Sequence, residues 1–488
     1  MEERKGFGTN FGFLMAAVGS AVGLGNIWGF PNKMGASGGF TFLVIYLILA
    51  VLCGFIVMVG ELALGRKTHH GAVGAYKALS KKFKWMGWMG ILSAFFILFF
   101  YCALGGYCIK YTVLNIGDLF HAGFGANALA ETAATNGNSL GAEVFGTFMS
   151  SPTEAIVYGL IFVAITMIIV IGGIGGGIEK VCSVGMPALF VMLLICIIRA
   201  CTLEGAVDGL KYMFVPGWAV TNGVIEEAPG FLTVLSTAGG QMFFSLSLGM
   251  GAMITYGSYL DKKENLQKNA LLIIVMDTLV ALMAGLCVIP GRFALDPTGS
   301  LGGPKLLFVT MQNVFSRMGG FGPIFGILFY LLVVFAAISS SISLLEVIVA
   351  HFVDKARNEG KGDMRKKYTL IAAACVGVGC ILVCADRLGD ASFTPWKLLN
   401  LPAESIRTWN DCWLDFWDML SEGIMMPLGA LLMSLMFGWE VGPDVVKEEC
   451  EASGHAMGGY GFFKVCIKYI TPLIMILILY GQIKEFFF

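Results

Sequence analysis

The sequence predicts an all-α, polytopic membrane protein that forms one domain over residues 1–488, with about eleven transmembrane helices. Two observations carry this prediction. Of the residues, 57% are hydrophobic and only 13% are charged, and many apolar runs reach the roughly 20 residues that a helix needs to cross a bilayer. The formal net charge of -1 leaves no basic surplus for nucleic acid. The lipid bilayer is therefore the expected surrounding, and nucleic acid is not an expected partner.

Eleven apolar segments follow one another along the chain. The first residues, Met-Glu-Glu-Arg-Lys, precede a span that is too long and too rich in glycine for a cleavable signal peptide. The expected spans are 11–35, 40–64, 88–117, 154–172, 179–202, 231–260, 270–291, 321–352, 368–385, 412–437 and 466–484.

Lysine and arginine in the short loops predict the orientation in the membrane. They gather in the N-terminal segment, in the loop after the second span and in the loop after the eighth span, so these segments are expected in the cytoplasm. The loop 118–153 has neither Lys nor Arg and is expected outside. An odd number of spans then places the C-terminus outside, in a multi-pass protein of the cell (inner) membrane.

The 13 cysteines lie mostly inside expected spans, and no CxxC pair occurs. This pattern indicates neither a disulfide framework nor a zinc site. Most of these cysteines are therefore expected to be small packing residues.

The first span is interrupted over residues 19–26, Gly-Ser-Ala-Val-Gly-Leu-Gly-Asn. Each glycine costs about 1 kcal/mol relative to Ala in a helix interior, and an opened helix exposes backbone groups that lipid cannot hydrogen-bond. Such a break persists only where protein buries it and its backbone groups are used. It is therefore predicted to bind a polar ligand in mid-membrane, the alternative being close packing of a neighbouring helix.

A second glycine-interrupted segment, residues 239–251, lies in the sixth span. Because five spans separate the two breaks, the second copy is inverted, and residues 11–202 and 231–437 are expected to form two inverted repeats followed by an extra span over 466–484. Broken spans at matching positions indicate a transporter site at the repeat interface. The pairing favours ligand binding over simple helix packing.

Three segments resemble the neurotransmitter:sodium symporter family, and the resemblance extends over essentially the whole chain. They are the first-span motif followed by Phe30-Pro31, the sixth-span segment Gln241–Gly249 and the eighth-span segment Ala336–Ser341. The resemblance implies a LeuT-like 5+5 inverted repeat with helices 1 and 6 broken. With eleven spans, the chain is most similar to the bacterial amino-acid transporters of this family.

The resemblance implies an amino-acid site at the two breaks. A half-helix that begins near Leu24 presents free N–H groups and a positive dipole end to a carboxylate. The implied polar contacts are the amides of Leu24 and Gly25 and the hydroxyl of Tyr101 for the carboxylate, and the carbonyls of Ala21, Phe244 and Ser245 and the hydroxyl of Ser247 for the ammonium. The implied apolar lining is Ile97, Tyr101, Phe244, Ser247, Met250, Ser340 and Leu344.

That lining contains no acid or base to pair with a charged side chain. Ser247 is small enough to leave room for a bulky substrate, and Met250 is unbranched and adaptable. Neutral, hydrophobic L-amino acids are therefore the expected substrates, and whether aromatic ones are among them stays open.

The family resemblance also implies two sodium ions. Sodium is a hard cation that prefers several oxygen ligands, by extension from calcium and magnesium. The implied ligands of the first ion are the Ala21 carbonyl, the Asn26 side chain, Ser245, Asp277 and the substrate carboxylate. The implied ligands of the second are the carbonyls of Gly19, Val22 and Ala336 and the hydroxyls of Ser339 and Ser340.

Asp277 stands where many relatives carry Asn, as an isolated acid in an apolar span. Such a residue is costly in a membrane and is a functional candidate, with a purely structural hydrogen-bonding role as the alternative. Tyr46, Gln241 and Ser245 resemble parts of the chloride site of animal relatives, but Ala281 replaces their Ser. The prediction is that Asp277 replaces chloride, so that transport needs sodium and no chloride.

The implied gates differ at the two ends. At the inner end, Arg4 is expected to pair with Asp354, aided by Phe7 and Tyr259. At the outer end, the usual Arg is Gly29, although its expected partner survives as Asp415. Tyr101 and Phe244 are therefore expected to form most of the outer lid. Glu61 is expected either to brace the broken helices or to have a purely structural role. Glu346 is expected either to line the inner path or to have a purely structural role.

These expectations combine into a sodium-coupled symporter, not an enzyme, that takes up amino acids by alternating access as a monomer or weak homo-oligomer. An amino-acid sensor and a leak or channel-like protein of the same fold are the alternatives. Proton coupling in place of sodium is a further alternative within the favoured class.

Overall fold

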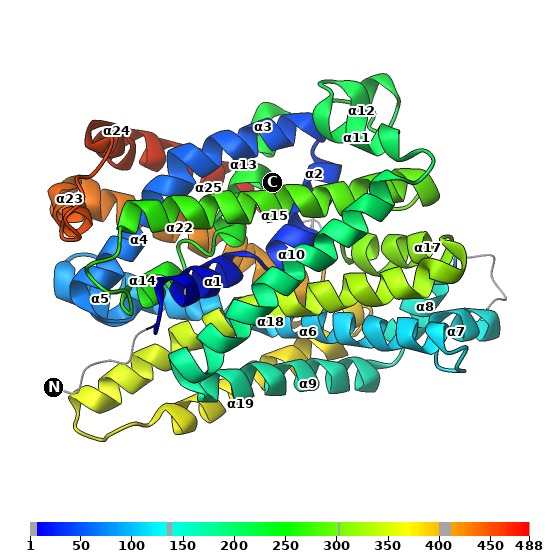
Figure 1. Ribbon diagram of the computed structural model, residues 1–488, viewed down its shortest axis with the longest axis horizontal. Helices are drawn as coiled ribbons and strands as arrows, with labels where there is room; N and C mark the ends of the chain where they lie inside the picture. The colour runs from blue at the N-terminus through cyan, green and yellow to red at the C-terminus, as the bar shows by residue number, and fades with distance from the viewer. Residues whose placement is uncertain (1–6, 134–138, 301–302, 400–410, 488) are drawn as a thin grey trace.

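The computed structural model describes residues 7–133, 139–300, 303–399 and 411–487. All regular structure in these residues is helical. Most long helices run roughly along the long axis of the molecule, and short helices cover both ends of the bundle (Figure 1). Arg4 lies outside the described residues, so the expected Arg4–Asp354 pair is not described.

Among the described residues, nine helices are long and apolar enough to span a membrane. They are Phe40–Thr68 (α3, η2 and α4), Met86–Leu119 (α6), Pro152–Ile171 (α9), Ile174–Cys201 (η3 and α10), Leu266–Leu295 (α15), Gly319–Asn358 (η5 and α18), Arg365–Gly389 (α19 and η6), Trp413–Glu440 (α21 to η9) and Tyr460–Phe486 (α24 to α25). The first and sixth expected spans are the two that are interrupted, so each of the eleven expected spans has a helical counterpart.

The first span consists of α1 (Asn10–Ala21) followed by η1 and α2 (Gly25–Ala36), with a bend of 45° between the two parts. Thr9 caps α1, because its hydroxyl accepts from the Gly12 amide at 2.9 Å. The helix stops where Val22 turns to extended backbone. The chain resumes as a π-helical turn over Gly25–Gly29, a form that is frequent at functional sites.

The sixth span consists of α13 (Phe231–Ser245) and α14 (Ala252–Gly257), joined by the non-helical residues 246–251. Gly249 has φ +81°, and a Cβ there would lie 2.2 Å from the Met426 carbonyl oxygen, so only glycine fits. Ser247 has φ +54°, which is uncommon for a residue with a side chain. Both expected breaks are therefore present.

Glu61 on α4 (Phe55–Thr68) braces the break in the sixth span. Its side chain is 1% exposed and accepts from the Gly249 amide at 2.7 Å. An opened helix needs such a partner, since lipid offers none. The bracing role weighed for Glu61 thus matches its hydrogen bond.

The broken first helix lies in the middle of the bundle. Helix α1 contacts α10 (Glu179–Cys201), α15 and α18 (Gly322–Asn358), and η1 contacts α15. Helices α1, α10 and α18 are seen side by side in Figure 1. This arrangement places the glycines of the break against protein on several sides.

Short helices that the sequence analysis treated as loops cover the ends. Helices α5 (Ala72–Leu79) and α23 (Asp444–Glu451) lie at one end, and α7 (Ala126–Ala133), α8 (Leu140–Met149) and α11 (Ala206–Phe214) lie at the other (Figure 1). The Lys-rich loop around α5 and the described parts of the loop 118–153 are therefore at opposite ends, as expected.

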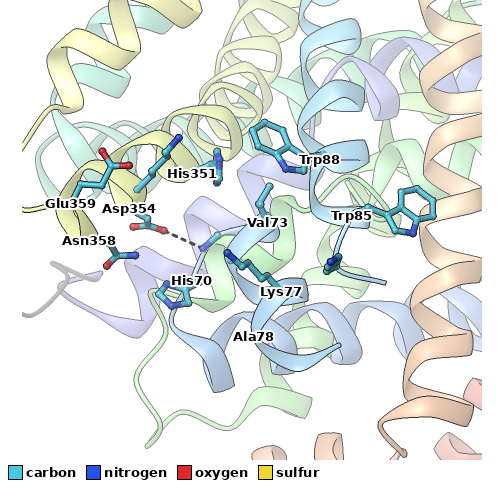
Figure 2. A pocket seen from close by; sticks show the side chains of 14 residues that line it. His70, Val73, Lys77, Ala78, Trp85, Trp88, His351, Asp354, Asn358 and Glu359 are labelled. Atoms are coloured by element: carbon cyan, nitrogen blue, oxygen red, sulfur yellow. Dashed lines mark hydrogen bonds between the residues drawn. The ribbon is translucent and has the colours of Figure 1, made fainter. Parts of the chain in front are cut away.

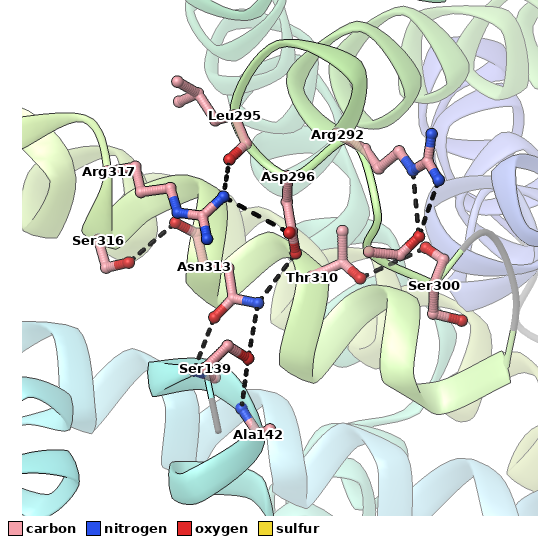
Figure 3. A network of polar contacts seen from close by, with 12 residues as sticks. Ser139, Ala142, Arg292, Leu295, Asp296, Ser300, Thr310, Asn313, Ser316 and Arg317 are labelled. Atoms are coloured by element: carbon pink, nitrogen blue, oxygen red, sulfur yellow. Dashed lines mark hydrogen bonds and ion pairs between the residues drawn. The ribbon is translucent and has the colours of Figure 1, made fainter. Parts of the chain in front are cut away.

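A polar network holds together the end that carries α7 and α8 (Figure 3). Asn313 on α17 (Met311–Ser316) donates to Asp296 at 2.9 Å and to Ser139 at 3.1 Å, and its oxygen accepts from the Gly141 amide at 2.7 Å. Arg317 approaches Asp296 to 3.5 Å. One asparagine thus joins α8, the end of α15 and α17.

All 13 cysteines are free thiols, and all but Cys201 and Cys375 are buried. Within the described ranges, no group of three or more His, Cys, Asp or Glu side chains is arranged to hold a metal ion.

Candidate substrate and sodium site

The break in the first helix is joined to Tyr101 on α6. The Leu24 amide donates to the Tyr101 hydroxyl at 2.8 Å, and the Gly23 amide donates to the Asn26 side-chain oxygen at 3.0 Å. Two groups that the sequence analysis assigned to a substrate carboxylate therefore lie within hydrogen-bonding distance of each other. A carboxylate held by one of them would be close to the other.

A small buried cavity lies at this point. Its volume is about 10 Å³, close to what one water molecule needs. An amino acid therefore requires side chains to move outward. The lining residues are Ser20, Ala21, Gly23, Gly25, Ile97, Tyr101, Phe244, Ser247, Met250, Ser340 and Leu344.

Nine of the eleven predicted substrate residues line this cavity, and Leu24 and Ser245 do not. Ser20 and Gly23 are the two additions. A Cβ at Gly23 would lie 2.2 Å from the Ser340 hydroxyl oxygen and 2.3 Å from that of Tyr101, so a larger residue would fill the cavity. The position of Gly23 in the glycine-rich segment could have identified it as a lining residue.

Two serines link the broken helices beside the cavity. The Ser247 hydroxyl donates to the Ser20 carbonyl at 2.8 Å, and the Ser20 hydroxyl donates to Ser343 at 2.8 Å. Ser247 is therefore engaged with the first helix in this conformation. Its predicted contact with a substrate ammonium requires that this bond be exchanged.

Aromatic rings cover one side of the cavity. The ring centroids of Tyr101 and Phe244 are 6.5 Å apart, and Phe244 stacks on Phe100 at 6.4 Å. Gly25 allows this approach, since a Cβ there would lie 2.9 Å from the Phe244 ring. The two residues of the predicted outer lid are thus neighbours.

Asn26, Ser245 and Asp277 converge beside the cavity. The Asn26 amide nitrogen donates to Asp277 Oδ1 at 2.7 Å and to Ser245 at 3.0 Å, and the Ser245 hydroxyl lies 3.0 Å from Asp277 Oδ2. All three side chains are 0% exposed. Three of the four predicted protein ligands of the first sodium ion therefore meet, with Ala21 in the wall of the cavity. Asn26 presents its nitrogen to this cluster while its oxygen accepts from the Gly23 amide, so its predicted role as an oxygen ligand requires the amide to turn.

The Asp277 carboxylate has polar but no cationic partners. Tyr46 donates to it at 3.3 Å, in addition to Asn26 and Ser245. No Lys or Arg of the described chain forms an ion pair with it. A buried ionised carboxylate is costly without a positive charge, and a sodium ion would supply that charge.

The residues that resemble a chloride site do not form one compact site. Tyr46 and Ser245 hydrogen-bond to Asp277, whereas Gln241 donates to the Gly25 carbonyl at 2.7 Å. Two of the three side chains thus contact a fixed carboxylate where relatives are expected to hold an anion.

The predicted ligands of the second sodium ion also converge, between α1 and α18. The Ser339 hydroxyl lies 3.2 Å from the Val22 carbonyl and 2.9 Å from that of Ala336. The Ser340 hydroxyl lies 3.3 Å from the carbonyls of Gly19 and Val22. Oxygens from two helices therefore gather in one place, as a hard cation requires.

Helix α10 covers this second cluster. A Cβ at Gly19 would lie 3.1 Å from Ser339 and 3.3 Å from the sulfur atoms of Cys182 and Met186 on α10. The Gly-rich segment just before α10 forms a π-helical turn, Ile174–Ile178. A conformational change in α10 would therefore displace atoms that pack against the second cluster.

At the end that carries α5, the predicted gate residues have partners that the sequence analysis missed. Tyr259 donates to Glu346 at 2.7 Å, and Arg365 binds both oxygens of Glu346 at 2.6 and 2.9 Å. Asp354 accepts from the Gly71 amide at 3.3 Å. Glu346, which is 0% exposed, is thus the centre of a buried ionic cluster and not only a lining residue.

At the opposite end, Gln241 occupies the space beside Gly29, where a Cβ would lie 2.9 Å from its side-chain oxygen. Asp415 lines a separate cavity of about 510 Å³ together with Lys305 and Arg387. One helical turn after Gly29, Lys33 forms an ion pair with Glu422.

Lys33 and Glu422 were missed, although a signal was present. Lys33 is the sole charged residue between Phe11 and Ala36, and Glu422 lies in an apolar span that also contains Asp415 and Asp418. Charged residues inside a membrane span mark functional or structural partners.

A helical membrane fold in which two interrupted helices meet at buried oxygen clusters defines the class of secondary transporters. Sequence comparison agrees: the sodium:neurotransmitter symporter family matches residues 4–121 and 153–394. The chain belongs to this family, whose members are sodium-dependent transporters and not enzymes.

Two of the similar proteins cover nearly the whole chain, and a third covers about half of it. It is 32% identical to the uncharacterized sodium-dependent transporter YhdH of Bacillus subtilis (strain 168), over 96% of each protein. The crystal structure of MhsT in complex with L-phenylalanine matches with a TM-score of 0.82 and 31% identity, covering 98% of this chain and 100% of MhsT. The human sodium- and chloride-dependent transporter XTRP3 is 28% identical over 56% of this chain and 47% of its own length. The expected LeuT-like fold is confirmed.

Proposed function

We propose that this protein couples the inward flow of sodium to the uptake of neutral, hydrophobic L-amino acids by alternating access. The proposal rests on one observation: two groups of polar side chains, the predicted ligands of the two sodium ions, adjoin the same cavity. Asn26 and Ser245, which hydrogen-bond to Asp277, directly follow the lining residues Gly25 and Phe244, and Ser340 itself lines the cavity next to Ser339. The rest of the lining is apolar or small and lacks a charged side chain.

The substrate carboxylate is proposed to bind at the Leu24 and Gly25 amides and the Tyr101 hydroxyl, completing the first sodium site. A carboxylate oxygen of the substrate is then itself one of the sodium ligands, so the binding of the ion and the binding of the substrate are directly coupled. The ammonium is proposed to bind at Ala21, Phe244, Ser245 and Ser247. The complex of the related MhsT with L-phenylalanine supports aromatic amino acids as candidates here.

The second ion is proposed to bind Gly19, Val22, Ala336, Ser339 and Ser340. Because these oxygens come from α1 and α18, the bound ion favours the arrangement in which the two helices are together. Loss of this ion would release α1 and open one end. Ligand binding can shift a conformational equilibrium only through such a difference in affinity between states.

The fixed charge of Asp277 is proposed to make transport independent of chloride. The carboxylate lies among the hydroxyls of Tyr46 and Ser245. An anion bound there as well would place two negative charges side by side in a low-dielectric site, which is unfavourable.

Several expectations about the whole molecule remain part of the proposal. The repeats are residues 11–202 and 231–437, with 466–484 as the extra span, and the protein lies in the cell membrane with the N-terminus in the cytoplasm and the C-terminus outside. The inner gate pairs Arg4 with Asp354, and Asp415 contributes to the outer vestibule. The transporter acts as a monomer or weak homo-oligomer.

Uptake into proteoliposomes tests the proposal. Purified protein should concentrate L-phenylalanine or L-leucine when sodium is high outside, and a sodium ionophore should abolish the accumulation. Binding without uptake would favour a sensor, and flux that never exceeds equilibrium would favour a leak. Uptake that persists when choline replaces sodium would indicate proton coupling.

A further inference from the structure

A third cavity, of about 850 Å³, lies where α5, the start of α6 and the end of α18 meet (Figure 2). It is at the same end of the bundle as α5 and far along α18 from Ser339 and Ser340. The proposed function uses one of its lining residues, Asp354 of the inner gate, but gives the cavity itself no ligand. Its lining combines lysines with exposed tryptophans.

The charges around this cavity are unequal. Lys77, Lys84 and Lys355 line it, and none of them forms an ion pair within the part of the chain that the structure describes. Of the two lining acids, Glu359 forms an ion pair with Lys361, which leaves Asp354 to offset three lysines. Asp354 accepts from the Gly71 amide at 3.3 Å (dashed in Figure 2), and Glu359 accepts from Lys361 at 2.5 Å. The cavity therefore has a surplus of positive charge that an anion would neutralise.

Two tryptophans give the cavity an apolar border. Trp85 and Trp88 are 49% and 46% exposed, and they stand at the start of α6, where this span begins. The Trp88 ring meets the His351 ring edge-on with centroids 4.7 Å apart (Figure 2). Tryptophans at the end of a membrane span belong at the level of the lipid headgroups.

We propose that this cavity binds the headgroup of an anionic phospholipid. The phosphate pairs with Lys77, Lys84 and Lys355, and the glycerol and upper acyl carbons lie against Trp85 and Trp88. A soluble phosphate would satisfy the lysines but would leave the exposed tryptophans without a partner. Basic pockets between membrane helices are suited to anionic headgroups for this reason. The bound lipid would bridge α5 and α18.

The test compares two triple variants of the full-length protein in detergent. Lys77→Gln/Lys84→Gln/Lys355→Gln removes the cavity lysines. Lys81→Gln/Lys82→Gln/Lys263→Gln is the matched control, because it removes the same charge from exposed positions outside the cavity lining. Retention of phosphatidylglycerol and phosphatidylcholine is measured by native mass spectrometry, and the shift in melting temperature is measured for each added lipid.

The unmodified protein is expected to retain phosphatidylglycerol in preference to phosphatidylcholine. The cavity variant is expected to bind phosphatidylglycerol about fivefold more weakly for each lysine removed, and on the order of 100-fold more weakly overall. The control is expected to lose less than about fivefold. Equal losses in the two variants, or no preference for phosphatidylglycerol, would overturn the proposal.

Two further measurements keep the test decisive. Brominated phosphatidylglycerol should quench the tryptophan fluorescence of the unmodified protein at a lower mole fraction than brominated phosphatidylcholine, and equal quenching would contradict the proposal even if the cavity variant does not fold. Glycerol 1-phosphate is added in the absence of lipid. Stabilisation equal to that by phosphatidylglycerol would assign the cavity to a soluble phosphate and overturn the lipid assignment.

Discussion

The side-chain amide of Asn26, in the break of the first helix, donates a 2.7 Å hydrogen bond to the carboxylate of Asp277 on α15. Both residues are fully buried. The bond ties the break to a helix that bears a negative charge in the middle of the bundle. An ion that enters the first sodium site meets this negative charge. Substitution of Asp277 is therefore a direct test of the proposed site.

Replacing Asp277 by Asn removes the fixed charge and keeps the size of the side chain. We expect Asp277→Asn to lose at least about tenfold of its sodium-driven uptake in gluconate, because a site built around a buried charge is left without it. Chloride should restore part of the uptake. The measurement is initial uptake in proteoliposomes with chloride or gluconate as the anion.

The double variant Asp277→Asn/Ala281→Ser sharpens this comparison. It adds the Ser that chloride-dependent relatives are expected to carry, so its uptake should respond more strongly to chloride than that of the single variant. If the unmodified protein itself stops transporting in gluconate, the assignment of Asp277 as the replacement for chloride is wrong.

Ser339 and Ser340 are expected to set the affinity for the second sodium ion. Ser340→Ala removes a hydroxyl that lies 3.3 Å from two carbonyls of the first helix. Its loss should raise the half-saturating sodium concentration about tenfold. Sodium titration of amino-acid uptake measures this value.

Ser341→Ala is the matched control for that experiment. The Ser341 hydroxyl is equally buried but meets Thr166 at 2.8 Å, on another face of α18. Its removal should leave the sodium dependence unchanged. A similar shift in both variants would mean that general damage to α18, and not loss of an ion ligand, causes the effect.

Tyr101 is expected to contribute one of the donors for the substrate carboxylate. Tyr101→Phe keeps the ring against Phe244 and removes the hydroxyl. A hydrogen bond to a charged group contributes about 1.5–3 kcal/mol, so substrate affinity should fall about 10- to 100-fold. Equilibrium binding of radiolabelled amino acid in saturating sodium measures it.

Tyr107→Phe provides the control for Tyr101, one and a half turns along the same helix. Tyr107 is buried, and its hydroxyl has no hydrogen-bond partner among the described residues. This variant should bind as the unmodified protein does. Equal loss in both variants would remove the hydroxyl of Tyr101 from the substrate site.

Lys33 and Glu422 are expected to stabilise the end of the bundle where Arg is absent at position 29. Lys33→Met leaves Glu422, which is mostly buried, without its cation. We expect a loss of about 2 kcal/mol in stability, less than for a fully buried pair because Lys33 is partly exposed. Thermal unfolding in detergent measures the change.

The double variant Lys33→Met/Glu422→Gln should recover part of that loss, because Glu422 is then no longer a buried charge without its cation, whereas Asp418 and Glu485, which also interact with Lys33, are unchanged. A double-mutant cycle isolates the interaction between the two side chains. Additive effects of the single changes would show that the pair is not energetically coupled.

The sequence predicted the spans and both breaks because these depend on local composition. When the two interrupted helices pack against α18, close contacts form at Gly19, Gly23 and Gly25. The first two of these glycines then lie beside the serines of α18. Short helices such as α5 and α8 were missed, since each is too short and too mixed in polarity to stand out. The ion pairs Lys33–Glu422 and Arg365–Glu346 join separate helices, and such pairs depend on how each helix is rotated about its axis.

The hydrogen bond between Ser247 and the first helix could not be predicted from the sequence either. Residue 247 adopts φ +54° and its hydroxyl donates to the Ser20 carbonyl, and a positive φ at a serine is not predicted by composition. The partner of the Leu24 amide, Tyr101, lies 77 positions away in the chain. Family resemblance brought the two residues into one site, whereas their mutual hydrogen bond is a feature of this conformation.

Sodium-driven accumulation in the absence of chloride tests the central claim most directly. Proteoliposomes with the purified protein would receive radiolabelled L-phenylalanine under an inward sodium gradient, with gluconate as the only anion on both sides. The account predicts accumulation above the external concentration that a sodium ionophore collapses. Absence of accumulation for every neutral hydrophobic amino acid, or accumulation that requires chloride, would contradict it.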